Sequence, residues 1–318
     1  MTLILPLARY RFQFTVTHPI RLPDWSGSLL RGAFGRALRQ LSCMTRQKDC
    51  AACPLYRTCP YPALFAPPAI EHEIQRFSQA PAPYLIEPDQ WGARLLQVGD
   101  TLQFNMVLTG RALRELPLIV ETWKRAAARG LGPAQGGQVG TAELRAIDYL
   151  PPQGEAIPIY RPESPHLADA PLQIPACPPV SRLNKITLRF TSPLRLQDNG
   201  HALTSAKLTP GPLLMAAVRR VALVSQLHGN GVPQWNFKAL AQQAALIAEG
   251  EKDLQWRDWT RHSSRQKSTM QLGGVTGHWQ LTGELNAFFP ALHLGTWLHL
   301  GKETVFGLGR YELEYDTV

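Results

Sequence analysis

The sequence has no apolar run long enough to span a membrane, and its N-terminus lacks the pattern of a signal peptide. The opening MTLILPLARYRF passes from a short apolar run into a strand-like alternation without a small-residue cleavage site. Charged residues make up only 18% of the 318 residues and hydrophobic residues 44%, which is enough to bury two cores of ordinary size. We therefore expect a folded, cytoplasmic protein of two domains with no membrane partner.

Cysteine is scarce outside one short segment. One cysteine, Cys177, stands alone, and the other four follow the spacing C-x6-C-x2-C-x5-C at Cys43, Cys50, Cys53 and Cys59. In a chain of this size, such clustering favours a metal site in a reducing compartment over a disulfide scaffold. We expect the four thiolates to hold one structural Zn²⁺, with no vacant position for catalysis and no catalytic metal elsewhere. An iron–sulfur cluster and four unligated thiols are the alternatives.

Acidic residues are outnumbered by basic ones. The 24 Asp and Glu stand against 33 Lys and Arg, so the net charge is +9 and the pI is near 9.5. Such an excess is typical of proteins that meet phosphate backbones. Charge alone leaves the partner open, because many basic proteins bind no polyanion.

One stretch of eight residues occurs twice. THPIRLPD runs from Thr17 to Asp24, and TSPLRLQD runs from Thr191 to Asp198. The segments before them, YRFQFTV and ITLRF, alternate apolar and polar residues and predict half-buried strands. The segments after them, LLRGAFGRALRQL from Leu29 and LLMAAVRRVALVSQL from Leu213, predict helices. The repeat therefore continues well beyond the eight residues.

Each copy then has the same order of elements. Strand candidates GDTLQFNMVLTG and GHWQLTGEL lead into apolar helical stretches that contain proline and a Thr-Trp pair. Each copy ends with Gly-Leu-Gly, at 130–132 and at 307–309, before a last strand. This order predicts an α+β fold of two ferredoxin-like halves, β-α-β-β-α-β written twice, with a cysteine-rich insertion in the first.

A proline-rich segment separates the two copies. It has nine prolines from Pro151 to Pro179, and proline cannot join the interior of a sheet. We predict an N-terminal domain over residues 1–150 with the cysteine cluster at 43–59, a linker over residues 151–182, and a C-terminal domain over residues 183–318.

These features together resemble a known family. The tandem layout, the C-terminal HLGKETVFGLGRYEL, the RHSSRQKSTMQLGG stretch and the cysteine cluster resemble the RAMP superfamily, more narrowly its CRISPR-associated repeat-processing endoribonucleases of the sixth Cas family. The resemblance implies recognition of a CRISPR repeat in precursor RNA, and a single metal-independent cut that gives guide RNA with a 2′,3′-cyclic phosphate. The implied partners are precursor and mature guide RNA, with other Cas effector subunits as further candidates.

The C-terminal glycine-rich loop is one candidate RNA contact. Gly301, Gly307 and Gly309 allow close backbone approach, and Lys302 and Arg310 add positive charge. A phosphate could lie against such a loop. The alternative is a tight connection from a helix to a strand.

The segment DLQWRDWTRHSSRQKSTMQLGG is a second candidate. It mixes tryptophans with basic residues, as RNA-contacting segments do, and its candidate contacts are Arg257, Arg261, Arg265 and Lys267. Basic neighbours should hold His262 neutral and available as a base near neutral pH. His262 could equally be a surface histidine beside the RNA contacts.

The first helix offers a third surface, which we expect to contain catalytic groups. Its apolar positions fall on one side and Arg31, Arg36 and Arg39 on the other. The resemblance implies cleavage residues here, commonly a histidine with a tyrosine or lysine, yet this helix has none of the three. Because arginine is a very poor base, we expect Arg36 and Arg39 to stabilise the developing charge, Arg31 to contact RNA, and His262 to transfer the proton. A solvated helix face is the alternative.

Two other functions fit the same sequence. A RAMP subunit that holds guide RNA in an effector complex without cleaving it would explain the missing histidine. An RNA-binding protein outside CRISPR systems would explain the charge.

Overall fold

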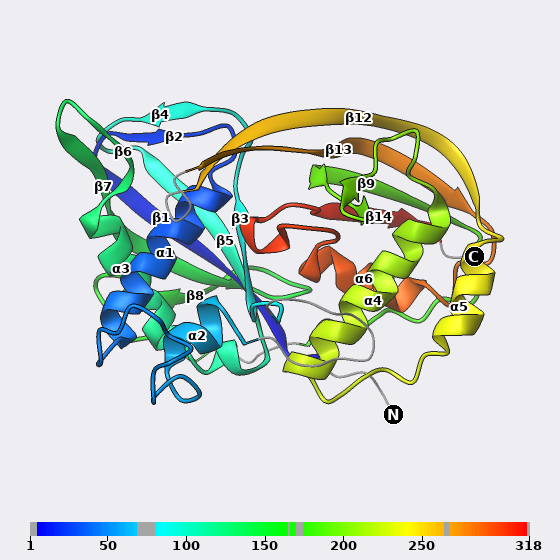
Figure 1. Cartoon of the computed structure of the whole chain (residues 1–318), viewed down its shortest axis with the longest axis horizontal. Coiled ribbons are helices and arrows are strands. Elements are labelled where there is room, and N and C mark those ends of the chain that lie inside the picture. The colour runs from blue at the N-terminus through cyan, green and yellow to red at the C-terminus, as the bar shows by residue number, and fades with distance from the viewer. Residues whose placement is uncertain (1–4, 69–79, 165, 170–173, 264–267, 317–318) are drawn as a thin grey trace. The chain divides into compact units, whose positions relative to one another are not determined.

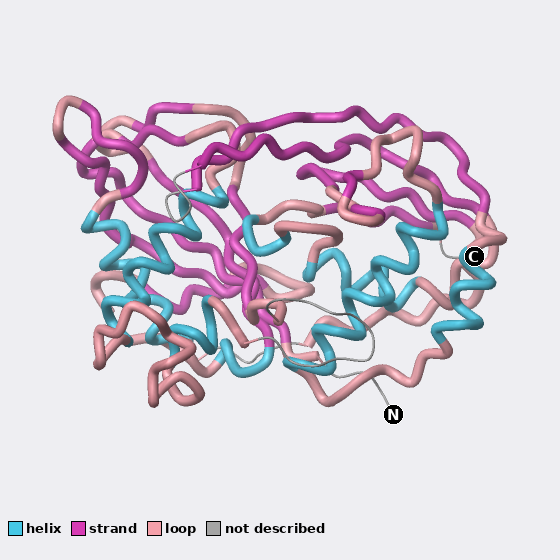
Figure 2. The backbone as a smooth tube through the Cα atoms, viewed as in Figure 1, coloured by secondary structure: helices cyan, strands magenta, loops and turns pink. Residues whose placement is uncertain are grey.

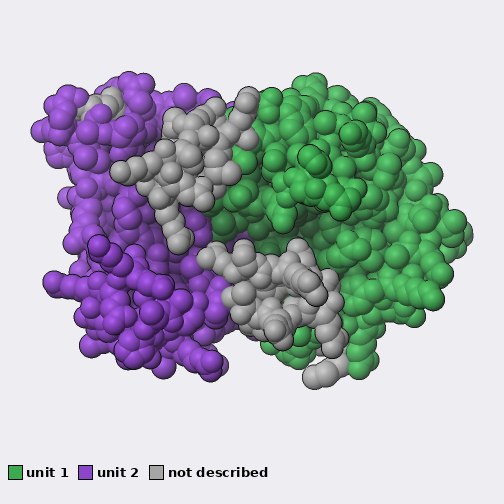
Figure 3. Space-filling view, in the orientation of Figure 1, with its two compact units in different colours: residues 1–5, 174–318 green, residues 6–173 purple. Residues whose placement is uncertain are grey.

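The computed structural model describes residues 5–68, 80–164, 166–169, 174–263 and 268–316. The chain forms two compact units, one from Pro6 to Gln173 and the other from Ile174 to Val318 together with Met1–Leu5. Figure 3 colours the first, the N-terminal unit, purple and the second, the C-terminal unit, green. No helix among the described residues is long and apolar enough to cross a membrane.

The N-terminal unit is an antiparallel sheet with two main helices. Its sheet has the order β3-β5-β1-β7-β6, and β8 pairs with β7. The strands and helices are β1 (Leu7–His18), β2 (Ile20–Leu22), α1 (Gly27–Ser42), α2 (Pro60–Phe65), β3 (Tyr84–Pro88), β4 (Arg94–Leu96), β5 (Thr101–Thr109), η1 (Gly110–Leu113), α3 (Leu116–Arg129), β6 (Leu131–Gln135), β7 (Gln138–Leu150) and β8 (Ile157–Tyr160). β2 and β4 form a separate two-stranded ribbon. The proline-rich segment thus contributes β8 to the edge of this sheet.

The core of this unit lies between the sheet and helices α1 and α3. Alternate residues of β1 are buried, as its sequence pattern predicts. Trp123 of α3 joins both layers, since its ring centroid lies 4.5 Å from that of Phe104 in β5 and 5.2 Å from that of Phe34 in α1.

The C-terminal unit repeats this design with a longer second and third strand. Its sheet has the order β12-β13-β9-β14. Its elements are β9 (Lys185–Leu194), β10 (Gln197–Asp198), β11 (His201–Ala202), α4 (Pro210–His228), α5 (Phe237–Ala244), β12 (Ala248–Ser263), β13 (Ser268–Thr282), α6 (Phe289–Leu298), η2 (Thr304–Phe306) and β14 (Tyr311–Tyr315).

Both sheets have the same strand order. If the four strands of the ferredoxin-like plan are numbered along the chain, β3-β5-β1-β7 and β12-β13-β9-β14 both read 2-3-1-4, and every pairing is antiparallel. The predicted α+β fold of two ferredoxin-like halves is therefore confirmed.

The repeated eight-residue stretch ends the first strand of each half. A Cβ on Gly132, whose φ is +85°, would lie 2.8 Å from the carbonyl oxygen of Arg21. A Cβ on Gly301, whose φ is +84°, would lie 2.5 Å from the carbonyl oxygen of Arg195, the matching residue of the second copy. In each half, a glycine is thus required where another segment packs on this turn.

β12 and β13 extend beyond the rest of their sheet (Figure 2). They pair with each other from Ala248 to Ser263, but β13 pairs with β9 only between Val275 and Thr282. We call the projecting part, residues 256–263 and 268–274, the hairpin arm. The predicted strand near Gly277 is correct but begins earlier, and the segment rich in arginine and tryptophan is its partner strand. β12 is an edge strand of this sheet.

Candidate functional site

Helix α1 separates apolar and basic side chains as its sequence predicts. Leu30, Phe34 and Leu38 are buried, whereas Arg36 is exposed. In the described part of the chain, Arg36 forms no hydrogen bond or ion pair that would hold its guanidinium. It can therefore meet a ligand without breaking an internal contact.

Arg31 and Arg39, in contrast, are held by the segment after α1. The Arg31 guanidinium lies 4.1 Å from the centroid of the Phe65 ring in α2, and its Nη2 donates to the Phe65 carbonyl at 3.3 Å. Arg39 donates from Nη2 to the carbonyl oxygens of Gln47 (2.7 Å) and Lys48 (3.0 Å). The structure thus joins Arg39 to the cysteine-rich insertion and Arg31 to α2, the helix that follows it.

Glycine at position 35 lets α2 approach α1 closely. A Cβ on Gly35 would collide with the Phe65 ring. Arg39 lies 5.8 Å from the ring centroid of Tyr61, which stacks on Phe65 with a centroid separation of 5.4 Å. α2 is therefore an aromatic support for the arginines of α1.

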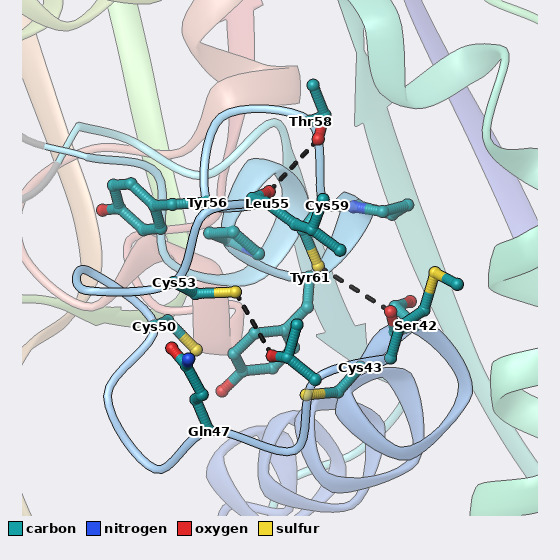
Figure 4. Close-up of a pocket in the computed structure, with 14 residues that line it drawn as sticks. Ser42, Cys43, Gln47, Cys50, Cys53, Leu55, Tyr56, Thr58, Cys59 and Tyr61 are labelled. Atoms are coloured by element: carbon teal, nitrogen blue, oxygen red, sulfur yellow. Dashed lines mark hydrogen bonds between the residues drawn. The ribbon is translucent and has the colours of Figure 1, made fainter.

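The four clustered cysteines line one pocket, drawn in Figure 4. Cys43 is the C-cap of α1 and Cys59 the N-cap of α2. Between them, the Cys53 amide donates to the Cys50 carbonyl at 3.1 Å, and Thr45 Oγ1 lies 3.3 Å from Cys53 Sγ. The insertion thus begins and ends at helix termini and brings all four thiols to one place.

The thiols influence one another electrostatically. Burial raises the pKa of the Cys50 thiol, the Arg39 guanidinium opposes this rise, and the other three cysteines reinforce it. All the cysteines are free thiols in this structure. Among the described residues, no three His, Cys, Asp or Glu side chains stand at the spacing of metal ligands. The predicted Zn²⁺ site stays a prediction.

The glycine-rich loop is held by backbone hydrogen bonds, two of them to the repeated turn at the end of β9. The Lys302 amide donates to the Arg195 carbonyl, the Gly307 amide to the Thr304 carbonyl, and the Gly309 amide to the Pro193 carbonyl. A Cβ on Gly309 would collide with the Leu300 carbonyl. These amides are therefore already engaged, and the groups left for a phosphate are the side chains of Lys302, which is exposed, and Arg310, which is half-buried.

Arg220 of α4 holds this loop and was not found by sequence reasoning. Its guanidinium donates to the Leu298 carbonyl at the end of α6 (3.1 and 3.3 Å) and to Thr304 Oγ1 (3.1 Å). Burial lowers its pKa to about 10, so it stays charged at neutral pH. The available signal was a pair of arginines, Arg219 and Arg220, among the apolar residues of α4.

The hairpin arm contains the second group of predicted contacts. Arg257 is exposed, Trp256 is 37% exposed with its Nε1 donating to Asp258 Oδ1 at 2.8 Å, and Trp259 is buried. Arg261 and His262 lie on β12, where they pair with Met270 and Thr269 of β13. Arg265 and Lys267 lie outside the described residues.

His18 is a further candidate for proton transfer. It is exposed at the end of β1, and its Nδ1 lies 2.7 Å from Thr141 Oγ1, which is 2.6 Å from Thr17 Oγ1. Its Nε2 has no hydrogen-bond partner among the residues that the structure describes. The signal in the sequence was its place in the repeated stretch, where the second copy has Ser192.

Known proteins share this arrangement. A family model described as CRISPR-associated endoribonuclease Cas6 matches residues 188–311, and one described as an N-terminal domain (AF_1859_N) matches residues 5–172. No curated protein matches the sequence.

Solved structures agree on the fold. A chain of a partial Cas6-RT-Cas1–Cas2 complex is 14% identical with a TM-score of 0.55, covering 98% of this chain and 46% of that one. This chain thus spans about half the length of that relative. A Cas6 product complex is 15% identical, with a TM-score of 0.55 and coverage of 97% and 100%. A Thermus thermophilus Cas6 is 14% identical, with a TM-score of 0.51 and coverage of 98% and 99%.

The two ferredoxin-like halves give the chain the same fold as the solved Cas6 structures. The chain belongs, through its residues 5–172, to the AF_1859_N family of N-terminal domains, and its residues 188–311 match the model of the CRISPR-associated endoribonuclease Cas6.

Proposed function

We propose that this chain processes CRISPR precursor RNA by binding the repeat and cutting it once without a metal ion. The observation that carries the proposal is the Cas6 match over residues 188–311, because it covers most of the second ferredoxin-like half from β9 to β14. The products would be guide RNA with a 2′,3′-cyclic phosphate and a downstream fragment with a 5′-hydroxyl. Other Cas subunits are proposed partners, since one similar chain belongs to a complex with Cas1–Cas2.

Repeat binding would use the basic side chains of the C-terminal unit. Arg257 and Lys302 are exposed and Arg310 is half-buried, so each can meet a phosphate. Trp256, which is 37% exposed, is the proposed contact for an unpaired base. Arg261, Arg265, Lys267 and His262 are the further RNA contacts of the proposal.

The cut would be an internal transfer at phosphorus. The 2′-hydroxyl loses its proton to a base and attacks the adjacent phosphorus, the bond from phosphorus to the 5′-oxygen breaks, and that oxygen receives a proton from an acid. No water enters this step, so neither a metal nor a bound hydroxide is needed to make the nucleophile.

The proposed residue roles depend on which side chains can reach RNA without breaking an internal contact. Arg36, which is exposed, would stabilise the charge on the phosphorane. Arg39 could join it only by leaving the Gln47 and Lys48 carbonyls. The proton would be transferred by His262 or, as a second candidate, by His18, whose Nδ1 is held near Thr141.

Cleavage of a labelled repeat RNA in EDTA tests the proposal. We expect one cut, a cyclic-phosphate end, and no cut in a matched RNA with a single 2′-deoxy substitution at the nucleotide before the site. Cleavage of the deoxy substrate would exclude the internal nucleophile. Tight, repeat-specific binding without cleavage would instead support the non-cleaving RAMP subunit, and binding indifferent to the repeat would support a general RNA-binding protein.

Single-turnover rates on bound RNA then test the residues. Arg36→Ala should slow cleavage about 100-fold with little loss of affinity, as for the removal of one donor to a developing oxyanion. One of His262→Ala and His18→Ala should slow the same step. Wild-type rates for both histidine variants would leave proton transfer to another group.

A further inference from the structure

The insertion from Cys43 to Cys59 is ordered without a core of its own. It contains no helix or strand, and none of its side chains is buried. Twelve of its seventeen side chains are exposed, and the other five are those of Tyr56, Cys43, Cys50, Cys53 and Cys59. The inward-facing groups of this segment are therefore its four thiols and one aromatic ring.

Apolar burial does not explain why the segment keeps this conformation. Met44 is 84% exposed and Leu55 38% exposed, although they are the aliphatic side chains available to build a core. Arg46 has a φ of 54°, the left-handed region that disfavours residues with a Cβ. Ordering an irregular, exposed and locally strained segment needs an opposing stabilisation, and small coreless segments commonly obtain it from a metal or a disulfide.

We propose that Cys43, Cys50, Cys53 and Cys59 together bind one thiophilic divalent cation, of which Zn²⁺ is the best match. The ion takes four sulfur ligands in a tetrahedron, and the C-x2-C turn with its Cys53-to-Cys50 hydrogen bond presents two of them. Each thiol loses one proton on binding, so the site carries two negative charges. The exposed Arg46, Lys48 and Arg57 lie on the same segment and offset that charge.

The thiols must move to reach the ion. They line one pocket here but are not at ligand spacing, and the pocket side chains can rotate because none of the four is buried in a packed core. Closing the four sulfurs around one ion joins the C-cap of α1 to the N-cap of α2. α2 supports Arg31 through Phe65, and the loop before it holds Arg39 through Gln47 and Lys48. The cation would thus position the basic face of α1 from a distance.

Metal content tests the site directly. The full chain, purified without chelators, should contain about one Zn²⁺ per molecule, as a closed four-thiolate site requires. Replacement by Co²⁺ should give the visible absorption of tetrahedral cobalt–thiolate. Cys50→Ser and Cys53→Ser should lose the metal, whereas Cys177→Ser, the matched control outside the segment, should keep it. Wild-type protein without stoichiometric metal would overturn the proposal, and so would iron together with inorganic sulfide.

Limited proteolysis of the wild-type protein tests the site without any cysteine variant, so it remains valid if the variants misfold. Trypsin can cut the wild-type segment after Arg46, Lys48 and Arg57, all exposed. If cleavage requires local opening, adding Zn²⁺ to chelated protein at about 100 times its Kd should slow it about 100-fold. Equal cleavage rates with and without Zn²⁺ would count against the ion.

Whether the ion positions the arginines of α1 is measured by repeat RNA binding. This part of the inference rests on the proposed function. Chelation of the wild type should weaken repeat RNA binding as Arg31→Ala does, and Zn²⁺ should restore it. Chelation should add nothing to the effect of Arg31→Ala. Metal content and the cobalt spectrum do not depend on RNA, so the metal site and the proposed RNA function can fail independently.

Discussion

Helices α1 and α4 come after the first strand of their halves, and pairing Leu29 with Leu213 sets Arg36 against Arg220. Arg36 is exposed, whereas Arg220 is engaged by the Leu298 carbonyl and Thr304. At equivalent positions of the two halves, Arg220 thus holds a loop and Arg36 is open to a ligand. The C-terminal half uses its arginine for rigidity, and the N-terminal half keeps its arginine available.

The halves also differ in the segment after this helix. The N-terminal half has the cysteine insertion and α2, which hold Arg31 and Arg39. The C-terminal half has α5 and then strands of 16 and 15 residues, against five and nine for β3 and β5. The N-terminal half therefore has added segments that contact its first helix, whereas the C-terminal half has a longer hairpin of β12 and β13.

The largest effect should come from the two glycines that pack on the repeated turn. Gly132→Ala and Gly301→Ala combine a positive φ with a carbonyl contact, so each should lower the free energy of unfolding by about 3 kcal/mol. Gly200→Ala is the control, because its φ is +84° but its Cβ would meet nothing within 4 Å. Urea unfolding of the full chain measures all three. If Gly301→Ala is no worse than Gly200→Ala, the two halves do not share this packing.

Replacement of Arg220 should affect mainly the stability of the fold, and replacement of Arg36 mainly the rate of RNA cleavage. Arg220→Met removes three hydrogen bonds and should lower stability by about 2 kcal/mol, whereas Arg36→Met should change it by less than about 0.5 kcal/mol. The rate of RNA cleavage should respond more strongly to Arg36→Met. Thermal unfolding and single-turnover cleavage of both variants check this, and similar profiles for the two would remove the contrast.

The salt dependence of RNA binding should arise from the hairpin arm and the glycine-rich loop more than from the helices of the N-terminal half. Arg257→Ala and Lys302→Ala should each weaken repeat RNA binding and reduce the salt slope of log K by about one counterion unit. Arg125→Ala, in α3, changes the net charge equally but removes an exposed pair with Glu121, so its slope should stay at the wild-type value. Binding measured over a series of salt concentrations tells them apart.

The smallest effect concerns a helix position occupied by histidine in one half only. Pairing Thr122–Trp123 with Thr296–Trp297 sets Ile119 against His293, and burial lowers the pKa of His293 below its ordinary value of 6.5. The unfolded chain then takes up this proton at a higher pH than the folded chain, so stability is lost as pH falls below about 6.5. His293→Ile should flatten this part of the stability profile. An unchanged profile would mean that His293 titrates alike in both states.

Sequence predicted the elements that local patterns specify. Alternation around Phe12 and Phe14 indicated β1, and helical spacing of Leu30, Phe34 and Leu38 indicated the buried side of α1, because each pattern needs only the segment itself. The repeat then supplied the topology, since two copies of one order of elements suggested one plan.

The parts that sequence missed depend on distant partners. β12 mixes Trp256, Arg257 and Asp258 in succession, so its strand character comes from pairing with β13 rather than from alternation. α2 has six residues, and its position against α1 depends on the close approach of Phe65 to Gly35. The role of Arg220 depends on a carbonyl 78 residues away, which no local spacing can reveal.

The long outer edge of β12 has a consequence for handling the protein. A strand with one side unpaired in its own sheet offers backbone groups to any other strand, and long flat edges lead to aggregation. In β12, the exposed charges of Glu249, Glu251 and Asp253 and a bulge between Glu249 and Lys252 oppose such aggregation. Glu249 also pairs with Lys252 and Glu251 with His278, so these charges make contacts within the fold as well as act against self-association. Removing them to improve crystal packing would therefore favour fibrous precipitates over crystals.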